Sequence, residues 1–284
     1  MTLASDTVSD GAERRRRDPW DTATRFGLVE FDLLATFAGV EAPFPLRVPS
    51  FGRIDEEREV LFGAASHTLA ARGLAEESGP LDIAAELVDA LRHRTGTVDM
   101  VLIGTGMPVG VVAMVAGPTA VLCRQALDDD PSGFVDVRTV RSTAVAAELA
   151  GMLPKLAGAS TMPIRLPTAS VVAGGKALTR AGKPPSDDSL RRVLATSGIE
   201  QVELESLVTA VPSLAGRGQA GATRRSAPGA DRRVGRELSW LDGPKGRVRV
   251  DNQDSWVSVN PLRPDEVRAT FDEFSLLARS PERG

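Results

Sequence analysis

The stretch that decides the fold covers residues 98–127 and reads VDMVLIGTGMPVGVVAMVAGPTAVLCRQAL. Three short runs rich in valine, leucine and isoleucine are separated by two turn signals, Gly104-Thr105-Gly106 with Pro108, and Gly117-Pro118. Runs of this kind, bounded by glycine and proline, are typical of β-strands joined by tight connections. The stretch therefore predicts an antiparallel meander with strands at 98–103, 109–115 and 120–127.

Helical periodicity occupies the residues before the meander. In the stretch 54–72, Leu61, Ala65 and Leu69 repeat every four residues and mark one apolar face. Acidic residues fill its first turn, where they complement the helix dipole, and Gly73 follows as a residue able to take the left-handed conformation that ends a helix. The predicted elements are an amphipathic opening element at 29–37 and helices at 54–72 and 81–94.

The same order of elements returns in the second half of the chain. A strand at 134–140 and a helix at 142–153 close the first half. Two helices, several short strands and a final helix beginning at Pro264, a favoured first helical residue, then follow. Residue identity between the halves is low, so the repeat is inferred from element order alone. The predicted elements of the second half are helices at 187–197 and 200–211, and strands near 219–224, 234–241, 247–250 and 256–259.

This order predicts an α+β fold, in which a central, largely antiparallel β-sheet is flanked by helical bundles and two helix-helix-strands-helix halves form a pseudo-two-fold repeat. Residues 1–24 are polar and arginine-rich, so we expect a disordered tail there. We expect a single domain over 25–284. Its two halves, about 25–155 and 184–284, are joined by a connector at 156–183. The arginine- and glycine-rich residues 217–233 predict a long, mobile hairpin.

Composition narrows the classes of function. The chain has 284 residues, of which 42% are hydrophobic, so it can bury a sizeable core. A net charge of −4 argues against a general attraction to nucleic acid. The most apolar run, 109–122, is broken by Gly117 and Pro118 and is too short to span a bilayer, and no apolar signal segment follows the N-terminal arginines. Together with the single cysteine, these features lead us to expect a cytoplasmic protein without membrane insertion.

A search for catalytic groups gives a mostly negative result. The only histidines are His67 and His93, for which structural or surface roles are favoured over catalysis. Cys123 lies in a predicted strand, which favours a buried structural thiol over a nucleophile. The acidic run 128–130 could bind a hard cation but lacks the later ligands of an EF-hand loop, so a solvated turn is favoured. Because no zinc spacing, nucleophile elbow, Walker A motif or dinucleotide fingerprint is present, we expect no catalytic residue, metal or cofactor.

The C-terminal third carries the most specific series of motifs. Residues 216–225 read GRGQAGATRR and are followed by GRELSWLDGPKGRVRV and SWVSVNPLRPDEV. Nearer the N-terminus, residues 54–74 read IDEEREVLFGAASHTLAARGL, a helix with an acidic start that ends in Arg-Gly-Leu. In this order the series resembles the EspG family of actinobacterial type VII secretion chaperones, over about residues 26–278. The arginine-rich N-terminal extension departs from the usual pattern of the family.

The resemblance implies both a fold and an activity. EspG proteins have a central β-sheet with helical bundles and approximate internal two-fold symmetry, as the repeat above also predicts. They bind the exposed apolar tip of helical PE–PPE substrates in the cytosol, keep them soluble and direct them to one type VII (ESX) system, without cofactor or nucleotide. A WxG-type or PPE-like client stays open, as does a monomeric or homodimeric state. The alternatives are a small-ligand-binding or sensor module without catalysis and, less favoured, an enzyme.

By analogy with the family, the partner-binding surface is expected on the central sheet and the C-terminal helical pair. Trp240 and Trp256 are candidate contacts, because tryptophan is common in binding hot spots. Packing inside the sheet is the alternative interpretation for both side chains.

Five further residues are candidates for the same surface. Leu204, Leu207 and Val208 could line the groove, although core packing is favoured for these helical apolar residues. Arg224 and Arg225 could contact acidic groups at the edge of the groove. The arginine-rich stretches could also bind an acidic partner, with a solvated tail and loop as the favoured interpretation.

Overall fold

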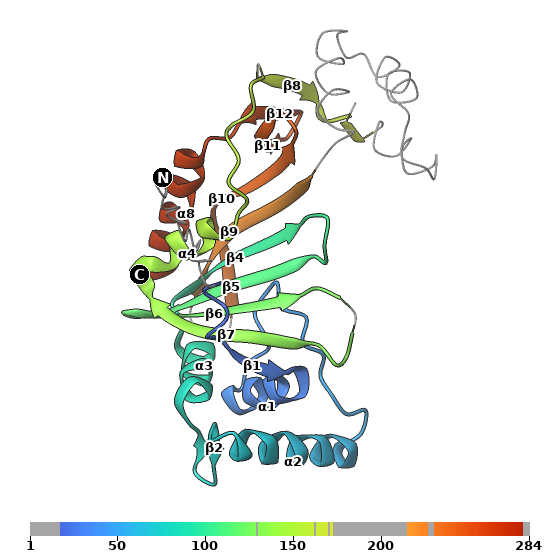
Figure 1. Cartoon of the computed structure of the whole chain (residues 1–284), viewed down its shortest axis with the longest axis vertical. Helices are drawn as coiled ribbons and strands as arrows, with labels where there is room; N and C mark the ends of the chain where they lie inside the picture. Colours follow the sequence, from blue (N-terminus) through green and yellow to red (C-terminus); the bar gives the residue numbers. More distant parts are fainter. Residues whose placement is uncertain are drawn as a thin grey trace, which may run out of the picture.

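A ten-stranded antiparallel sheet forms the centre of the molecule (Figure 1). The structure is a computed structural model and describes residues 18–128, 130–161, 163–169, 171–172, 215–226 and 230–280. The first half contains β1 (Thr24–Gly27), α1 (Leu28–Ala38), α2 (Asp55–Ala71), the small hairpin of β2 (Ala75–Glu76) and β3 (Gly79–Pro80), α3 (Asp82–His93), β4 (Gly96–Ile103), β5 (Val109–Ala116), β6 (Thr119–Ala126), β7 (Phe134–Arg141), the 3-10 turn η1 (Ser142–Ala144) and α4 (Val145–Gly151). The second half contains β8 (Ile164–Pro167), β9 (Gly216–Ser226), β10 (Ala230–Gly243), β11 (Gly246–Gln253), β12 (Trp256–Pro261) and α8 (Pro264–Arg279).

The strand order is symmetric about the centre of the sheet. It reads β1-β7-β6-β5-β4 and then β9-β10-β11-β12-β8, so the second half reverses the order of the first. β4 and β9 meet in the middle as an antiparallel pair, with Gly96 opposite Arg224 and Ile103 opposite Arg217. A helix follows the last long strand of each half, α4 after β7 and α8 after β12, and these two helices pack against each other. The arrangement confirms the predicted α+β fold with its pseudo-two-fold repeat.

The sequence pattern does not predict the two edge strands, β1 and β8. β1 pairs with β7 and β8 pairs with β12, so each forms the outer edge of its half. The expected connector at 156–183 is therefore not wholly a linker, because β8 lies within it and its residues Ile164 and Leu166 are 6% and 3% exposed. Four-residue strands are too short for an alternating pattern to stand out in the sequence.

The fold also begins earlier than the sequence predicts. Residues 1–17 lie outside the described residues, but 18–24 are not part of a disordered tail. Trp20 is 7% exposed and belongs to the core cluster beside α4 and α8. The guanidinium groups of Arg124 and Arg138 stack on its ring, 4.5 and 4.7 Å from the centroid. A single tryptophan among polar residues carries no periodicity, so its burial has no signal in the sequence pattern.

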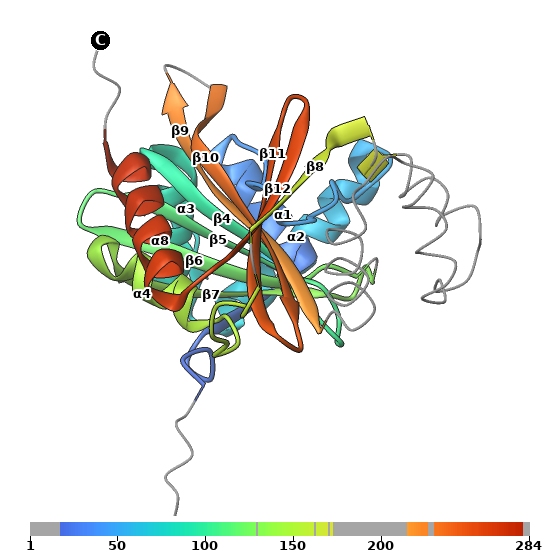
Figure 2. The same cartoon turned by 90° about the horizontal axis from the view of Figure 1, so that it is seen from above.

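The strands of the meander are buried on both faces. Val111, Ala113 and Val115 of β5 belong to the core cluster beneath α4 and α8, while Val112 and Met114 belong to the cluster beneath α1 and α3. This explains why the strands are continuous apolar runs instead of alternating ones. Figure 2 separates α4 and α8 on one side of the strands from α1 and α2 on the other.

The other predicted elements of the first half and the last four predicted strands agree closely with the structure. The helices predicted at 187–197 and 200–211 lie outside the described residues. A long, mobile hairpin is expected at 217–233, but its described residues, 217–226 and 230–233, belong to β9 and β10 in the middle of the sheet. Since β9 pairs with β4 on one side and with β10 on the other, ladder hydrogen bonds hold it along both edges.

Candidate functional site

The middle strands β4, β9 and β10 present one face that α4 and α8 do not cover. Cross-strand partners share a face of the sheet, so the pairs Val101–Gln219 and Ser239–Gln219 place these side chains on one surface. A groove with a cavity volume of about 410 Å³ runs over it. We call it the central groove. The side chains on this face are those of Val101, Ile103, Arg217, Gln219, Ser239, Leu241 and Val250.

A polar hollow of about 350 Å³ lies on the same strands, toward the N-terminal end of β4. Thr97 and Asp99 of β4 face Thr223 of β9 and Arg233 of β10 there. Phe44, from the loop after α1, is 65% exposed and stands at the hollow. The open face of the middle strands therefore changes from apolar in the central groove to polar in this hollow.

A hydrogen-bonded network crosses the polar hollow. Arg233 of β10 pairs with Asp99 of β4, two strands away, and its Nε donates to Glu237 Oε1 at 2.7 Å. Glu237 Oε2 accepts from Gln219 Nε2 at 2.6 Å, which links the network to the central groove. Arg233 can lie flat across β9 because residue 221 is glycine, and a Cβ there would overlap its guanidinium. The network thus connects the two halves of the molecule across the centre of the sheet.

Asp99 is the most deeply placed group of this network. It is 2% exposed, and burial, together with the charge of Glu237, raises the pKa of its carboxyl despite the hydrogen bond and charge of Arg233. Arg233 is the charged partner that a buried carboxylate requires, so we interpret the network as a structural brace that links the strands. The other carboxylate that lines the hollow, Asp231, pairs with Arg94 at 2.8 Å.

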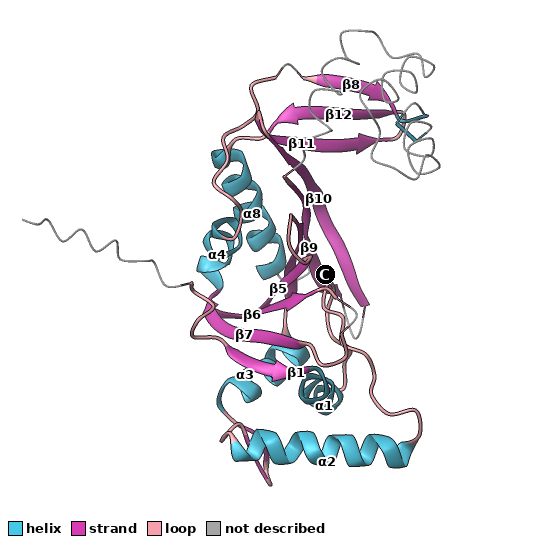
Figure 3. Ribbon diagram, turned by 45° about the vertical axis from the view of Figure 1, so that its right-hand side comes forward, coloured by secondary structure: helices cyan, strands magenta, loops and turns pink. Residues whose placement is uncertain are grey.

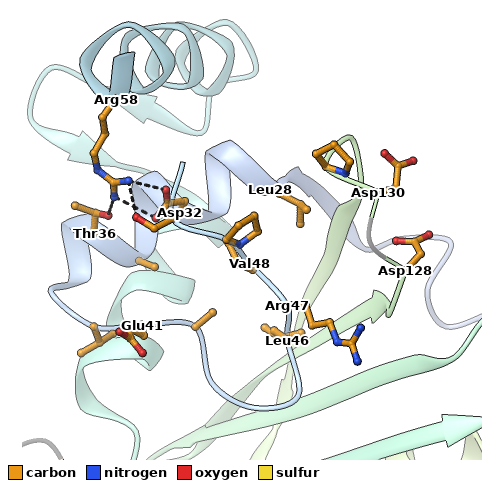
Figure 4. A pocket seen from close by; sticks show the side chains of 16 residues that line it. Leu28, Asp32, Thr36, Glu41, Leu46, Arg47, Val48, Arg58, Asp128 and Asp130 are labelled. Carbon is orange, nitrogen blue, oxygen red and sulfur yellow. Dashed lines mark hydrogen bonds and ion pairs between the residues drawn. The ribbon is translucent and has the colours of Figure 1, made fainter. Parts of the chain in front are cut away.

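A separate pocket of about 780 Å³ lies beside α1. Figure 4 shows Arg58 of α2 directed at Asp32 and Thr36 of α1 on one side, with Asp128 and Asp130 of the β6–β7 turn on the other. Arg58 and Asp32 form an ion pair at 3.1 Å, so their charges satisfy each other. Polar groups that already pair leave little to orient a small ligand, although the volume lies in the range of small-ligand sites.

The structure separates the two candidate tryptophans. Trp240 borders the central groove but is 2% exposed, because its ring lies against Gly218 in the core beneath α8. Its environment therefore agrees with the packing interpretation. Trp256 begins β12, is 44% exposed and lies 5.6 Å from the guanidinium of Arg165. Its register places it on the face opposite Val257 and Val259, so it does not line the central groove.

The two candidate arginines hold helix ends. Arg224 donates from Nε and Nη2 to the carbonyl oxygen of Leu277 in α8, both at 3.3 Å. Arg225, on the other face of β9, donates from Nη1 to the carbonyl oxygens of Leu91 and Arg92 in α3, at 3.0 and 2.8 Å. A cation suits the C-terminal end of a helix, where carbonyl oxygens lack partners within the helix. These contacts assign both arginines to the packing of helices on the sheet.

The remaining candidates, Leu204, Leu207 and Val208, lie outside the described residues. The apolar residues of the central groove, in contrast, are missed by sequence reasoning. Ile103 and Leu241 sit at the ends of their strands, beside turn residues, and nothing in the pattern tells which face of the sheet stays uncovered. Residues 237–240, Glu-Leu-Ser-Trp, alternate between polar and apolar, and an apolar residue at 241 breaks this alternation, which is the one available signal.

The two histidines, Cys123 and Asp130 all lie in structural or surface settings. His93 Nδ1 lies 2.8 Å from Asp89 Oδ1 one helical turn away, and His67 is exposed on α2. Cys123 is fully buried, and burial raises the pKa of its thiol, in agreement with a structural role. Asp130 accepts hydrogen bonds from the backbone and hydroxyl of Ser132, which lower the pKa of its carboxyl.

Within the described part of the chain, no group of three or more His, Cys, Asp or Glu residues is arranged to hold a metal ion. Among its helices, none combines the length and the apolar character needed to cross a membrane.

Comparison with known proteins places the fold. The model of the EspG family matches residues 28–273, most of the chain. A solved structure of the Mycobacterium tuberculosis type VII secretion system chaperone EspG5, in complex with the PE25–PPE41 dimer, superimposes with a TM-score of 0.63 at 16% sequence identity, over 93% of this chain and 98% of that one. No curated protein sequence matches the chain. The structural match shows a shared fold, and the family match covers most of the sequence; the chain belongs to the EspG family.

Proposed function

We propose that this protein is a type VII secretion chaperone. It binds the apolar tip of a helical PE–PPE-like client in the cytoplasm, keeps the client soluble and directs it to the secretion system. Membership of the EspG family supports this function. The EspG5 structure, in which that relative holds the PE25–PPE41 dimer, supports the class of client.

The apolar strip of the central groove, which the described helices leave uncovered, is the observation that assigns the proposed binding to a surface. Val101, Ile103, Leu241 and Val250 are all partly exposed there, although they lie in the middle of the sheet. Burying one aliphatic side chain of a client against them stabilises a complex by about 1.5–3 kcal/mol before ordering costs. A client with an exposed apolar tip would otherwise self-associate.

The chaperone acts by burial, with no bond made or broken. Arg217 is the ionisable group that lines the central groove itself, and beside the groove Asp99 and Glu237 both pair with Arg233. They form a polar border to an apolar floor, which is the usual composition of a protein interface. Binding without nucleotide hydrolysis requires moderate affinity or competition by the secretion machinery for release.

The alternative of a small-ligand module has less support. The pocket beside α1 is its best location, yet it opens to solvent and its Arg58–Asp32 pair is internally satisfied. A shallow, open apolar groove fits a protein client better than it fits a small molecule.

Co-expression with helical type VII substrates encoded nearby tests the proposal. The wild-type chain should raise the soluble yield of its client and co-elute with it. Leu241→Glu, which places a charge on the groove floor, should abolish co-elution while the chain stays folded. Leu276→Glu is the matched control, because Leu276 is 59% exposed on α8, outside the groove. Absence of any co-eluting substrate, or equal loss with Leu276→Glu, contradicts the proposal.

A further inference from the structure

Helix α2 is attached to the rest of the molecule by few apolar contacts. Of its 17 residues only Ala65 and Leu69 are buried, and Val60 is 72% exposed. α3 is shorter, at 12 residues, yet buries more than twice as many side chains, those of Ala84, Leu87, Val88, Ala90 and Leu91. Figures 1 and 3 show α2 as the outermost layer, with α1 between it and the sheet. Apolar burial alone therefore accounts for little of its attachment.

Two arginines of α2 reach two carboxylates of α1. Arg58, in the first turn, donates from Nη1 and Nη2 to the two oxygens of Asp32 at 3.1 and 3.2 Å, and to Thr36 Oγ1 at 2.9 Å (Figure 4). Arg72, at the C-cap, donates from Nη1 to the two oxygens of Glu30 at 3.1 and 2.9 Å. We call these contacts the two latches. They fix the helix at both ends, with directed hydrogen bonds in place of an apolar seam.

The two latches can open without leaving an unpaired buried charge, because both partners of each ion pair separate into water together. Asp32 and Glu30 are 8% and 9% exposed, and α2 supplies the arginine partner of each. A buried charge is costly when one partner is removed and the other stays buried. When the whole helix leaves, carboxylates and guanidinium groups return to water together, so no charge is stranded. A helix held by leucine side chains would instead expose apolar surface to water when it leaves, and nothing would offset that cost.

Carboxylate contacts that do not involve α2 persist after such a departure. Glu30 Oε2 accepts from the backbone N–H of Gly27 at 3.0 Å, which caps α1. Asp32 Oδ2 accepts from the backbone N–H of Phe51 at 2.9 Å, in the loop before α2. α1 therefore keeps its N-terminal cap and its loop contact without α2.

We propose that α2 is a detachable strap, which undocks from α1 as one unit while α1 and the sheet stay folded. The loop 39–54 precedes it, and Gly73, with φ of 71°, follows it as a flexible end. Salt weakens the latches and promotes undocking. Undocking also withdraws Arg58 from the pocket beside α1, so the position of the strap controls access to that pocket. This device is independent of the client-binding function proposed above.

Hydrogen exchange of the full chain, followed by mass spectrometry, tests the strap. An undocked helix of this length is marginal in water, so its amides exchange during each undocking event. Amides of 55–71 should exchange at least about tenfold faster than those of α3, and about threefold faster again when NaCl rises from about 0.05 to about 0.5 M. Exchange equal to that of α3 at both salt concentrations overturns the proposal.

Two variants separate the latches from general stability. Arg58→Met should accelerate exchange in α2 several-fold and leave the sheet unchanged. Asp32→Leu combined with Arg58→Leu replaces a latch by an apolar pair, and should slow exchange in α2 and reduce its salt dependence. Arg268→Met is the control, because Arg268 pairs with Asp272 at 3.3 Å on α8. Acceleration in β4–β7 equal to that in α2 would mean global unfolding and would overturn the strap.

Discussion

Strand β9 uses glycine in the same way on its two faces, with opposite results. On one face, Gly218 leaves room for the ring of Trp240; on the other, Gly221 leaves room for the guanidinium of Arg233, and a Cβ at either position would overlap that side chain. Trp240 is closed into the core beneath α8, whereas the side chain of Arg233 stays 32% exposed in the polar hollow. Gly218 and Gly221 are thus required by the side chains of Trp240 and Arg233 in β10. α8 covers the face that carries Trp240, whereas the face that carries Arg233 stays partly exposed, so helix coverage decides which face is core.

The largest expected change in stability comes from removing the aromatic ring of Trp240. Trp240→Ala should lower the free energy of unfolding by about 3–5 kcal/mol, because it deletes a buried ring and leaves a cavity next to Gly218. Chemical denaturation followed by circular dichroism measures the change.

The second described tryptophan of the C-terminal strands is the control for this experiment. Trp256 is 44% exposed and contacts Arg165, so Trp256→Ala should cost about 0.5–1 kcal/mol. Equal losses for the two substitutions would contradict the assignment of Trp240 to the core and Trp256 to the surface.

The next test adds a methyl group to each face of β9. Gly218→Ala should cost about 1–3 kcal/mol, since the new Cβ meets a ring that the core holds in place. Gly221→Ala should cost less, below about 1 kcal/mol, because the end of a half-exposed arginine can move aside. The measurement is the difference between the two denaturation midpoints at constant slope. A larger loss at Gly221 would show that the Arg233 brace is more rigid than the Trp240 packing.

The contrast between these faces shows where sequence reasoning succeeds. The meander, the helices of the first half and the repeat follow from periodicity, because residues such as Val111 and Val112 are apolar whichever face they occupy. The motif GRGQAGATRR supports the family resemblance, but its glycines have no visible cause until β10 is placed beside β9.

The candidate site was harder to predict, for a physical reason. Period-two alternation tells which residues share a face, but not whether a helix covers that face. Trp240 and Leu241 are adjacent, and only the position of α8 shows that the first is core and the second belongs to the central groove. Arg224 and Arg225 suggest a charged edge until the carbonyl oxygens of α8 and α3 are seen beside them.

These two arginines give a smaller test of the same two faces. Arg224→Met and Arg225→Met should each lower the free energy of unfolding by about 0.5–1 kcal/mol, because each removes a cation from a helix C-terminus. Since one acts on α8 and the other on α3, the double variant should show the sum of the two losses. Denaturation of the three variants measures this; clear non-additivity would mean that the two faces are coupled through β9.

The smallest expected effect concerns the buried carboxyl of the open face. Because burial raises the pKa of Asp99, the folded chain binds this proton more tightly than the unfolded chain does. The stabilising contribution of the proton is full below the unfolded pKa, about 3.9, and is lost as pH rises through the higher folded pKa. Asn cannot ionise and lacks this dependence, so the stability of the wild type relative to Asp99→Asn should increase as pH falls from about 7 to about 4.

Chemical denaturation of both chains across this pH range isolates the effect, because all other carboxylates are common to the two proteins and cancel. Arg233→Met in both backgrounds separates the two causes that act on Asp99. Without the arginine, its hydrogen bond and its charge no longer oppose burial and the charge of Glu237, which both raise the pKa of Asp99, so the difference in slope should grow. A wild type that loses stability relative to Asp99→Asn on acidification would instead mean that the Arg233 pair outweighs burial. The ionised Asp99 and its pair with Arg233 would then stabilise the open face at neutral pH.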